Sequence, residues 1–136
     1  MVKKIVQDPF FLKQKSTPAT KADQQVALDL LDTLKANEAG CVGLAANMIG
    51  VKKCVIAVNM GPLNVAMFNP VILQKNGAYE AEEGCLSLSG TRKTTRYEEI
   101  EVEYFDLHWN KQCHKFSGWV AEIIQHEIDH CNGILI

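Results

Sequence analysis

Two stretches of the chain carry apolar residues at helical spacing. In residues 20–40, Leu30 and Leu34 fall on one face with other apolar residues, which predicts an amphipathic helix. Thr20 followed by Asp23 resembles the capping box of a helix N-terminus. We interpret this helix as structural.

The second helical pattern lies near the end of the sequence, in residues 118–131. Ser117 is a suitable N-cap and Gly133 a suitable stop. Trp119, Ile123 and their apolar neighbours give this segment enough bulk to predict a buried helix.

The segments between these helices are predicted to be strands. Ile100, Val102 and Tyr104 alternate with glutamates, which is the period of a half-exposed strand. Pro70 hints at an edge or a break. Further strands are expected at 2–6, 53–59, 65–73, 113–116, and within 77–90 before a glycine-punctuated loop. The links between strands are too short for crossover helices. We therefore predict an α+β fold with antiparallel strands packed around a central C-terminal helix, one N-terminal helix, and a single domain of residues 1–136.

Composition narrows the class of protein. The chain has 136 residues, a formal net charge of −2 and 47% apolar residues, which suits one soluble domain. The near-neutral balance gives no reason to expect nucleic-acid binding. No apolar run has the length of a membrane span and no signal peptide is recognisable, so a cytoplasmic location is expected. Five widely spaced cysteines argue against a disulfide framework and favour reduced thiols, one of which could be a metal ligand.

Candidate chemistry lies in the second helix, in the sequence QHEIDH at residues 125–130. His126 and His130 are four residues apart, so both can reach a single ion from one helix face. Glu127 lies beside them, where a carboxylate can take a proton from a metal-bound water. A solvent-exposed histidine pair is the alternative. Because histidines on a buried helix need partners, the apolar character of the helix favours a metal.

A catalytic metal site needs a third protein ligand. Cys131 follows His130 directly and faces elsewhere on the helix. His108 and His114 lie in expected strands and are interpreted as ordinary surface histidines. Cys85 lies in a glycine-containing loop and ranks first by a narrow margin, with a buried structural thiol as the alternative reading. The carboxylates stay open as candidates.

Three motifs, in order, resemble those of the peptide deformylase family. The sequence CVGLAANMIG at residues 41–50 corresponds to the family's G-x-G-L-A-A-x-Q-x-G loop. The E-G-C-L-S motif is intact at residues 83–87, and Q-H-E-x-D-H is intact at residues 125–130. The last two motifs together are highly specific. The resemblance covers nearly the whole chain, which ends at Ile136 in the manner of the shorter, C-terminally truncated members.

The resemblance implies a metal ion held by Cys85, His126 and His130, with Fe²⁺ in the cell and Zn²⁺, Ni²⁺ or Co²⁺ able to replace it. It implies removal of the formyl group from N-formylmethionyl peptides, which the enzyme would meet at the ribosome. A metal-bound water would attack the formyl carbon, Glu127 would act as general base, and the backbone N–H of Leu86 would stabilise the oxyanion.

The resemblance also implies supporting roles. The peptide would lie extended beside Gly43 and pair with it as an added strand, with an apolar pocket for the methionine side chain. Arg96 would form an ion pair with Asp129, and Gln125 would support the metal ligands.

Two residues depart from the family's first motif. Cys41 replaces a glycine, adds bulk and would narrow the substrate groove. Met48 replaces a glutamine and cannot donate a hydrogen bond to an oxyanion, a donor typically worth about 10²–10³ in rate. The alternative function is therefore a deformylase-like paralogue that binds metal and formyl-peptide with weak or no turnover. A general H-E-x-x-H peptidase is a more distant alternative, because such enzymes commonly use a histidine or a carboxylate as third ligand.

Overall fold

The structure is a computed structural model that describes residues 1–136. Each strand of its single antiparallel sheet pairs with its neighbours in sequence. The strands are β1 (Gly43–Ala45), β2 (Val55–Asn59), β3 (Asn64–Cys85), β4 (Leu88–Phe105) and β5 (Lys111–Ser117). The helices are α1 (Pro9–Leu12), α2 (Gln24–Ala36) and α3 (Gly118–Cys131), with 3₁₀ turns η1 (Lys21–Asp23) and η2 (Ala46–Ile49). This is the α+β fold class that the sequence predicts.

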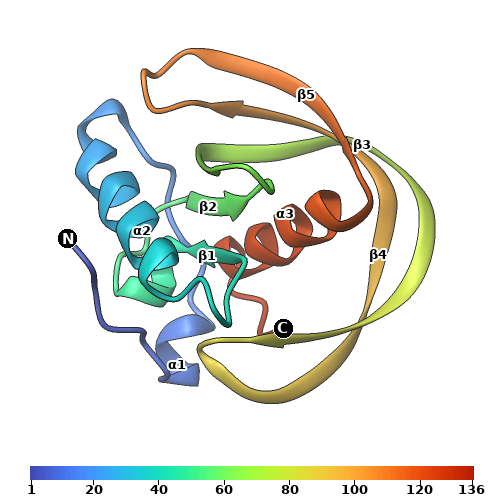
Figure 1. Ribbon diagram of the computed structural model, residues 1–136, viewed down its shortest axis with the longest axis horizontal. Coiled ribbons are helices and arrows are strands. Elements are labelled where there is room, and N and C mark those ends of the chain that lie inside the picture. The colour runs from blue at the N-terminus through green and yellow to red at the C-terminus, as the bar shows by residue number, and fades with distance from the viewer.

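Helix α3 runs through the middle of the molecule (Figure 1). Strands β3, β4 and β5 curve round one side of it, and β1 and β2 lie on the other side. The helix contacts β1, β2, β4 and β5. His126, Glu127 and His130 are all buried on it, so the C-terminal helix has the central place expected for it.

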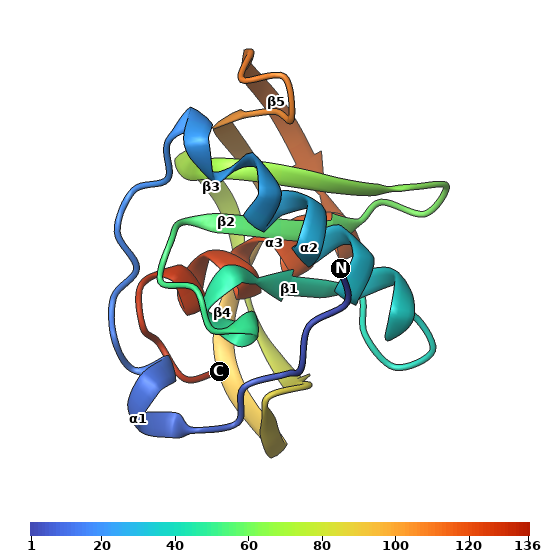
Figure 2. The ribbon, with the colours of Figure 1, turned by 90° about the vertical axis from the view of Figure 1, so that its left-hand side faces the viewer.

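Strand β2 lies between two helices, because both α2 and α3 contact it. Val55, Ile56, Ala57 and Val58 have no exposed surface, which is why this strand is a continuous apolar run rather than an alternating one. Figure 2 shows α2 lying over β1 and β2. The backbone N–H of Thr20 donates to Asp23 and the Thr20 hydroxyl accepts from Ala22 N–H, so the predicted capping box is present.

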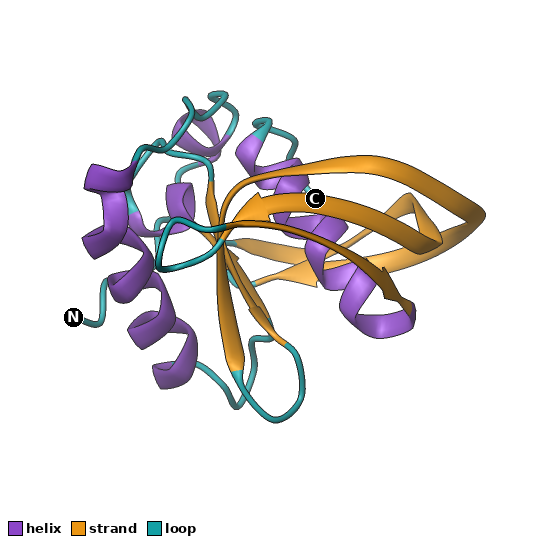
Figure 3. Ribbon diagram, turned by 90° about the horizontal axis from the view of Figure 1, so that it is seen from above, coloured by secondary structure: helices purple, strands orange, loops and turns teal.

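The hairpin of β3 and β4 is longer than the sequence indicated. The two strands have 22 and 18 residues, and they bow out round α3 on the side of the molecule opposite α2 (Figure 3). Pro70 was expected to mark an edge or a break, and a loop was expected around Gly84. Instead, the ladder shifts register between Phe68 and Val71 and again between Gly84 and Cys85. Such bulges bend a strand without ending it, so one curved strand replaces the two predicted ones.

Two other local predictions were wrong. Residues 2–6 form no strand, and their segment is joined to η2 by the bond from Val6 N–H to Met48 O. Residues 41–50, expected to be a loop, contain β1 and η2. The predicted hairpin of β4 and β5 is confirmed, with Val102 opposite His114. None of the helices combines the length and hydrophobicity that crossing a bilayer requires.

Candidate metal centre

Three metal-binding side chains converge where the end of β3 meets α3. The Sγ atom of Cys85 lies 3.3 Å from Nε2 of His130, which lies 3.2 Å from Nε2 of His126. All three ligand atoms lie within 4.8 Å of one another. The histidines share one face of α3, and Cys85 is the last residue of β3 before the turn into β4. The structure therefore brings together the three residues that the resemblance named.

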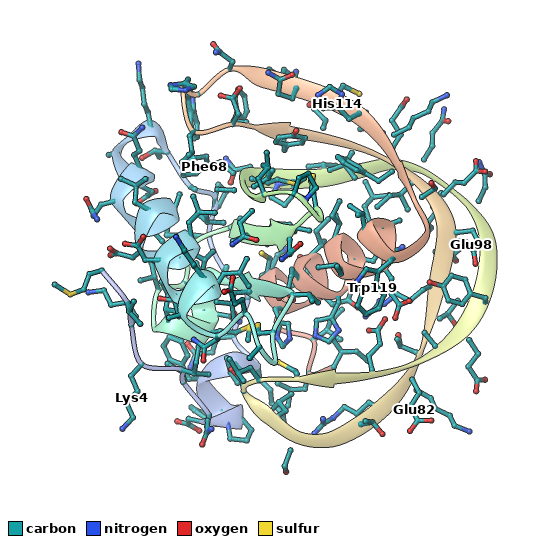
Figure 4. All side chains as sticks on the ribbon, viewed as in Figure 1. Lys4, Phe68, Glu82, Glu98, His114 and Trp119 are labelled. Atoms are coloured by element: carbon teal, nitrogen blue, oxygen red, sulfur yellow. The ribbon has the colours of Figure 1, made fainter.

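The other candidates for the third ligand lie elsewhere. His108 and His114 are both exposed, and Figure 4 shows His114 on β5 at the rim of the molecule. Cys131 is buried but does not belong to the cluster. Both surface histidines are thus as the sequence predicted.

The donor set fits a divalent metal ion. Nδ1 of His126 is hydrogen-bonded to a Glu83 carboxylate oxygen at 2.8 Å, which leaves Nε2 to face the other two ligand atoms. The Ser87 N–H donates to Cys85 Sγ at 3.4 Å, so the backbone of the turn contacts the sulfur. Cys85, His126 and His130 would hold such an ion, and sulfur and imidazole ligands suit a late first-row metal.

A buried charged network supports this cluster from behind. The Arg96 guanidinium donates to Glu83 through Nε and Nη2, at 3.0 and 2.8 Å, and through Nη1 to Asp129 at 2.6 Å. The predicted pairing of Arg96 with Asp129 is present, but Glu83 is the more buried partner, at 7% exposed. Within the E-G-C-L-S motif, no role was predicted for Glu83. Its signal was the two-residue spacing from Cys85, which places both side chains on one face of β3.

The network sets the charge of its members. Burial alone would raise the pKa of Glu83, but hydrogen bonds from His126 and Arg96 hold that pKa below its ordinary value. Burial alone would lower the pKa of His126, but hydrogen bonds to Cys85 and Glu83 raise it. Burial and the charge of His126 lower the pKa of His130 to about 3. Glu83 is therefore ionised, and His130 is neutral with a lone pair free for a metal.

Glu127 lies beside the cluster with no partner for one oxygen. Its Oε1 atom is buried and makes no hydrogen bond, and burial raises the pKa of Glu127 to about 7. A Cβ atom built at Gly43 would lie 2.8 Å from the other carboxylate oxygen and 2.7 Å from Cγ2 of Ile123. Only glycine lets β1 approach α3 this closely, so the carboxyl group and the strand edge face the same space.

Two amide side chains tie other elements to α3. Gln125 donates to Tyr97 O and accepts from Tyr97 N–H, both at 2.9 Å, and so holds β4 to the helix. Gln125 was expected to support the metal ligands, but its side chain bonds only backbone groups, those of Tyr97 and Ala121. Asn47 Nδ2 donates to His130 O at 2.9 Å, which ties η2 to the helix turn that carries a ligand. No role was predicted for Asn47 from the sequence.

The cluster opens into a cavity of about 560 Å³ between β1, the turn from β3 to β4, and α3. Its lining includes Val42, Gly43, Cys85, Leu86, Trp119, Glu122, Ile123, His126 and Glu127. The helix is buried as predicted, but Trp119, which contributed to the apolar bulk behind that prediction, is 61% exposed. Figure 4 shows it on the first part of α3, where it stands at the cavity.

The two residues that depart from the family motif lie differently. Cys41 lines the cavity, and its thiol donates to Gly43 O at 3.1 Å; burial raises its pKa to about 11, so the thiol keeps its proton. Met48 is 1% exposed and does not line the cavity. Its sulfur accepts a hydrogen bond from Ala45 N–H at 3.4 Å. The structure therefore does not place Met48 at the reacting group.

The convergence of two imidazoles and a cysteine sulfur beside a buried carboxyl group is typical of a metal-dependent hydrolase. Comparison with known proteins gives its family. The family model for polypeptide deformylase matches residues 2–136. The peptide deformylase of Clostridium beijerinckii is 59% identical over 136 residues, which cover 100% of both chains.

Solved structures agree. The crystal structure of peptide deformylase from Thermotoga maritima has a TM-score of 0.88 and 29% identity, covering 99% of this chain and 95% of that one. A class I type b peptide deformylase from Acinetobacter baumannii, with Met-Ala-Ser bound, has a TM-score of 0.87 and 31% identity, covering 99% and 97%. The chain belongs to the polypeptide deformylase family. This membership confirms the predicted hydrolase and its metal dependence, and it gives no support to the paralogue without turnover.

Proposed function

We propose that Cys85, His126 and His130 hold one divalent ion, Fe²⁺ in the cell, and that the site deformylates N-formylmethionyl peptides. The observation that carries this assignment is the convergence of the three ligand atoms within 4.8 Å beside a buried, unpaired carboxyl group. When bound, such an ion acts as a Lewis acid and lowers the pKa of a water molecule.

The chain's own residues perform the remaining steps. Glu127 takes the proton of the attacking water and returns it to the departing amine, which leaves formate and a free N-terminal methionine. The backbone N–H of Leu86, in the two-residue turn between β3 and β4, donates to the oxyanion that forms on the formyl carbon. The peptide pairs with β1 at Gly43, so that its formyl end points towards Glu127.

We further propose that residues 1–136 act as one catalytic domain and meet their substrates in the cytoplasm as nascent chains leave the ribosome. All five strands share one sheet, and a single core cluster includes residues of α2, β2 and α3, which supports one domain.

The test is an anaerobic assay of formate release from formyl-Met-Ala-Ser by the Fe²⁺-loaded protein. Glu127→Ala should lower kcat by about 10²–10⁴, the usual contribution of a general base. Its metal content, measured by mass spectrometry, should stay at one ion per chain, whereas Cys85→Ala should lose the ion. Glu80→Ala serves as control, because it removes an exposed carboxylate from β3, the strand that carries Cys85, outside the cavity. Formate release at the wild-type rate from Glu127→Ala would contradict the assigned base.

A further inference from the structure

The outer edge of β1 is the first feature of this inference. Strand β1 is at the end of the sheet, with β2 on one side only. Gly43 lies opposite Val58, and Asn59 N–H donates to Val42 O on the sheet side at 2.8 Å. In an antiparallel ladder the next residue then belongs to a non-hydrogen-bonded pair, so the N–H and C=O of Gly43 point away from β2. These are the two groups that an extended peptide would use.

One of these two groups already has a partner from within the chain. The Sγ atom of Cys41 lies 3.1 Å from Gly43 O, and Cys41 lines the same cavity as Gly43. A thiol is a weak donor, and a peptide N–H is a stronger one. The thiol therefore satisfies the Gly43 carbonyl in the free enzyme, and a peptide N–H can still replace it as the donor.

We propose that Cys41 is a positioning residue that governs peptide binding by capping the Gly43 carbonyl. An incoming backbone N–H must displace the thiol before it can pair with β1, so Cys41 raises KM and leaves kcat almost unchanged. The inference rests on the proposed function, because it concerns the peptide bound at that same edge.

Three variants separate this hydrogen bond from the size of the side chain. Cys41→Ala removes the donor, Cys41→Ser keeps a donor at the same place, and Cys113→Ala removes an exposed thiol outside the cavity as control. For formyl-Met-Ala-Ser, Cys41→Ala should lower KM about three- to ten-fold, the worth of one weak hydrogen bond, with kcat within about two-fold. Cys113→Ala should keep the wild-type KM. Cys41→Ser should have the wild-type KM or a higher one, because a hydroxyl donates more strongly than a thiol.

Peptide affinity gives a second readout that does not need turnover. The Kd of Met-Ala-Ser, followed by tryptophan fluorescence of the metal-loaded protein, should fall by the same factor in Cys41→Ala. An unchanged KM and Kd in Cys41→Ala would overturn the proposal, as would an equal fall in Cys41→Ser, because size alone would then explain the effect. Absence of formate from the wild type would contradict the proposed function, whereas normal turnover with an unchanged KM in Cys41→Ala would contradict only this inference.

Discussion

The cavity has two walls that are held in place by different forces. The ligand wall, which is α3 with residues 83–87 at the end of β3 and in the turn that follows, carries every residue assigned to the metal and rests on buried ion pairs. The edge wall is the segment of residues 41–48, of which residues 41–43 line the cavity and the rest pack behind them. It contains no charged side chain and is held by close packing, with Ala45, Ala46 and Met48 at most 1% exposed.

This difference accounts for where the sequence departs from its family's motifs. Loss of one partner of a buried ion pair strongly lowers the stability of the fold, because the other charge is left unpaired and away from water. Where no ion pair has to be kept, a side chain of similar volume, such as Met48 in place of a glutamine, is accepted at a smaller cost, and the added bulk of Cys41 lies at the cavity that this residue lines. Both departures, Cys41 and Met48, fall on the edge wall, whereas the two motifs of the ligand wall are intact.

The largest effect should come from cutting the charged network. Arg96→Ala leaves Glu83 without its guanidinium partner, so the free energy of unfolding of the metal-free protein should fall by about 3–5 kcal/mol. Metal affinity should fall about 10- to 100-fold, because Glu83 also orients His126. Urea unfolding and metal titration measure the two effects.

Arg92→Ala is the matched control, because Arg92 is part-exposed and its side chain donates only to Ser89 O at 3.4 Å. Its stability should stay within about 0.5 kcal/mol of the wild type. Equal stability of the Arg96 and Arg92 variants would show that the ligand wall does not depend on its ion pairs.

A smaller effect is expected where the two walls touch. In Gly43→Ala the new methyl group would lie 2.7–2.8 Å from Ile123 and Glu127, so β1 or the carboxyl group must shift. Because a displacement of about 1 Å can cost roughly 10² in rate, kcat/KM for formyl-Met-Ala-Ser should fall by about that factor. Gly40→Ala, where a methyl group meets nothing within 4 Å, should keep wild-type kinetics. A Gly43 variant as active as the Gly40 variant would refute the tight contact.

The sequence predicted the ligand wall better than the edge wall, for a physical reason. The spacing of His126 and His130 fixes their geometry within one helix turn, and the motif around Cys85 supplied the third ligand. The bends of a long strand and the pairing of a short one depend on residues far away in the sequence, so no local pattern predicts them. Pro70 and Gly84 break a strand in most contexts, but here bulges absorb them, and the edge wall's three-residue strand β1 is formed only by pairing with β2.

The smallest effect concerns Met48, the residue that first raised doubt about activity. Its sulfur is packed against Ala45 N–H, and the side chain does not line the cavity. Met48→Gln can keep that contact through Oε1, but its amide NH₂ is then buried. We expect a loss of about 1–3 kcal/mol in stability and less than about three-fold change in kcat. Met48→Leu is the control, because it removes the sulfur that accepts from Ala45 N–H and adds no polar group. If Met48→Gln instead raised kcat about 10²–10³-fold, the worth of an oxyanion donor, the side chain would have to reach the reacting carbonyl, and the edge wall would share in the chemistry that the structure gives to the ligand wall.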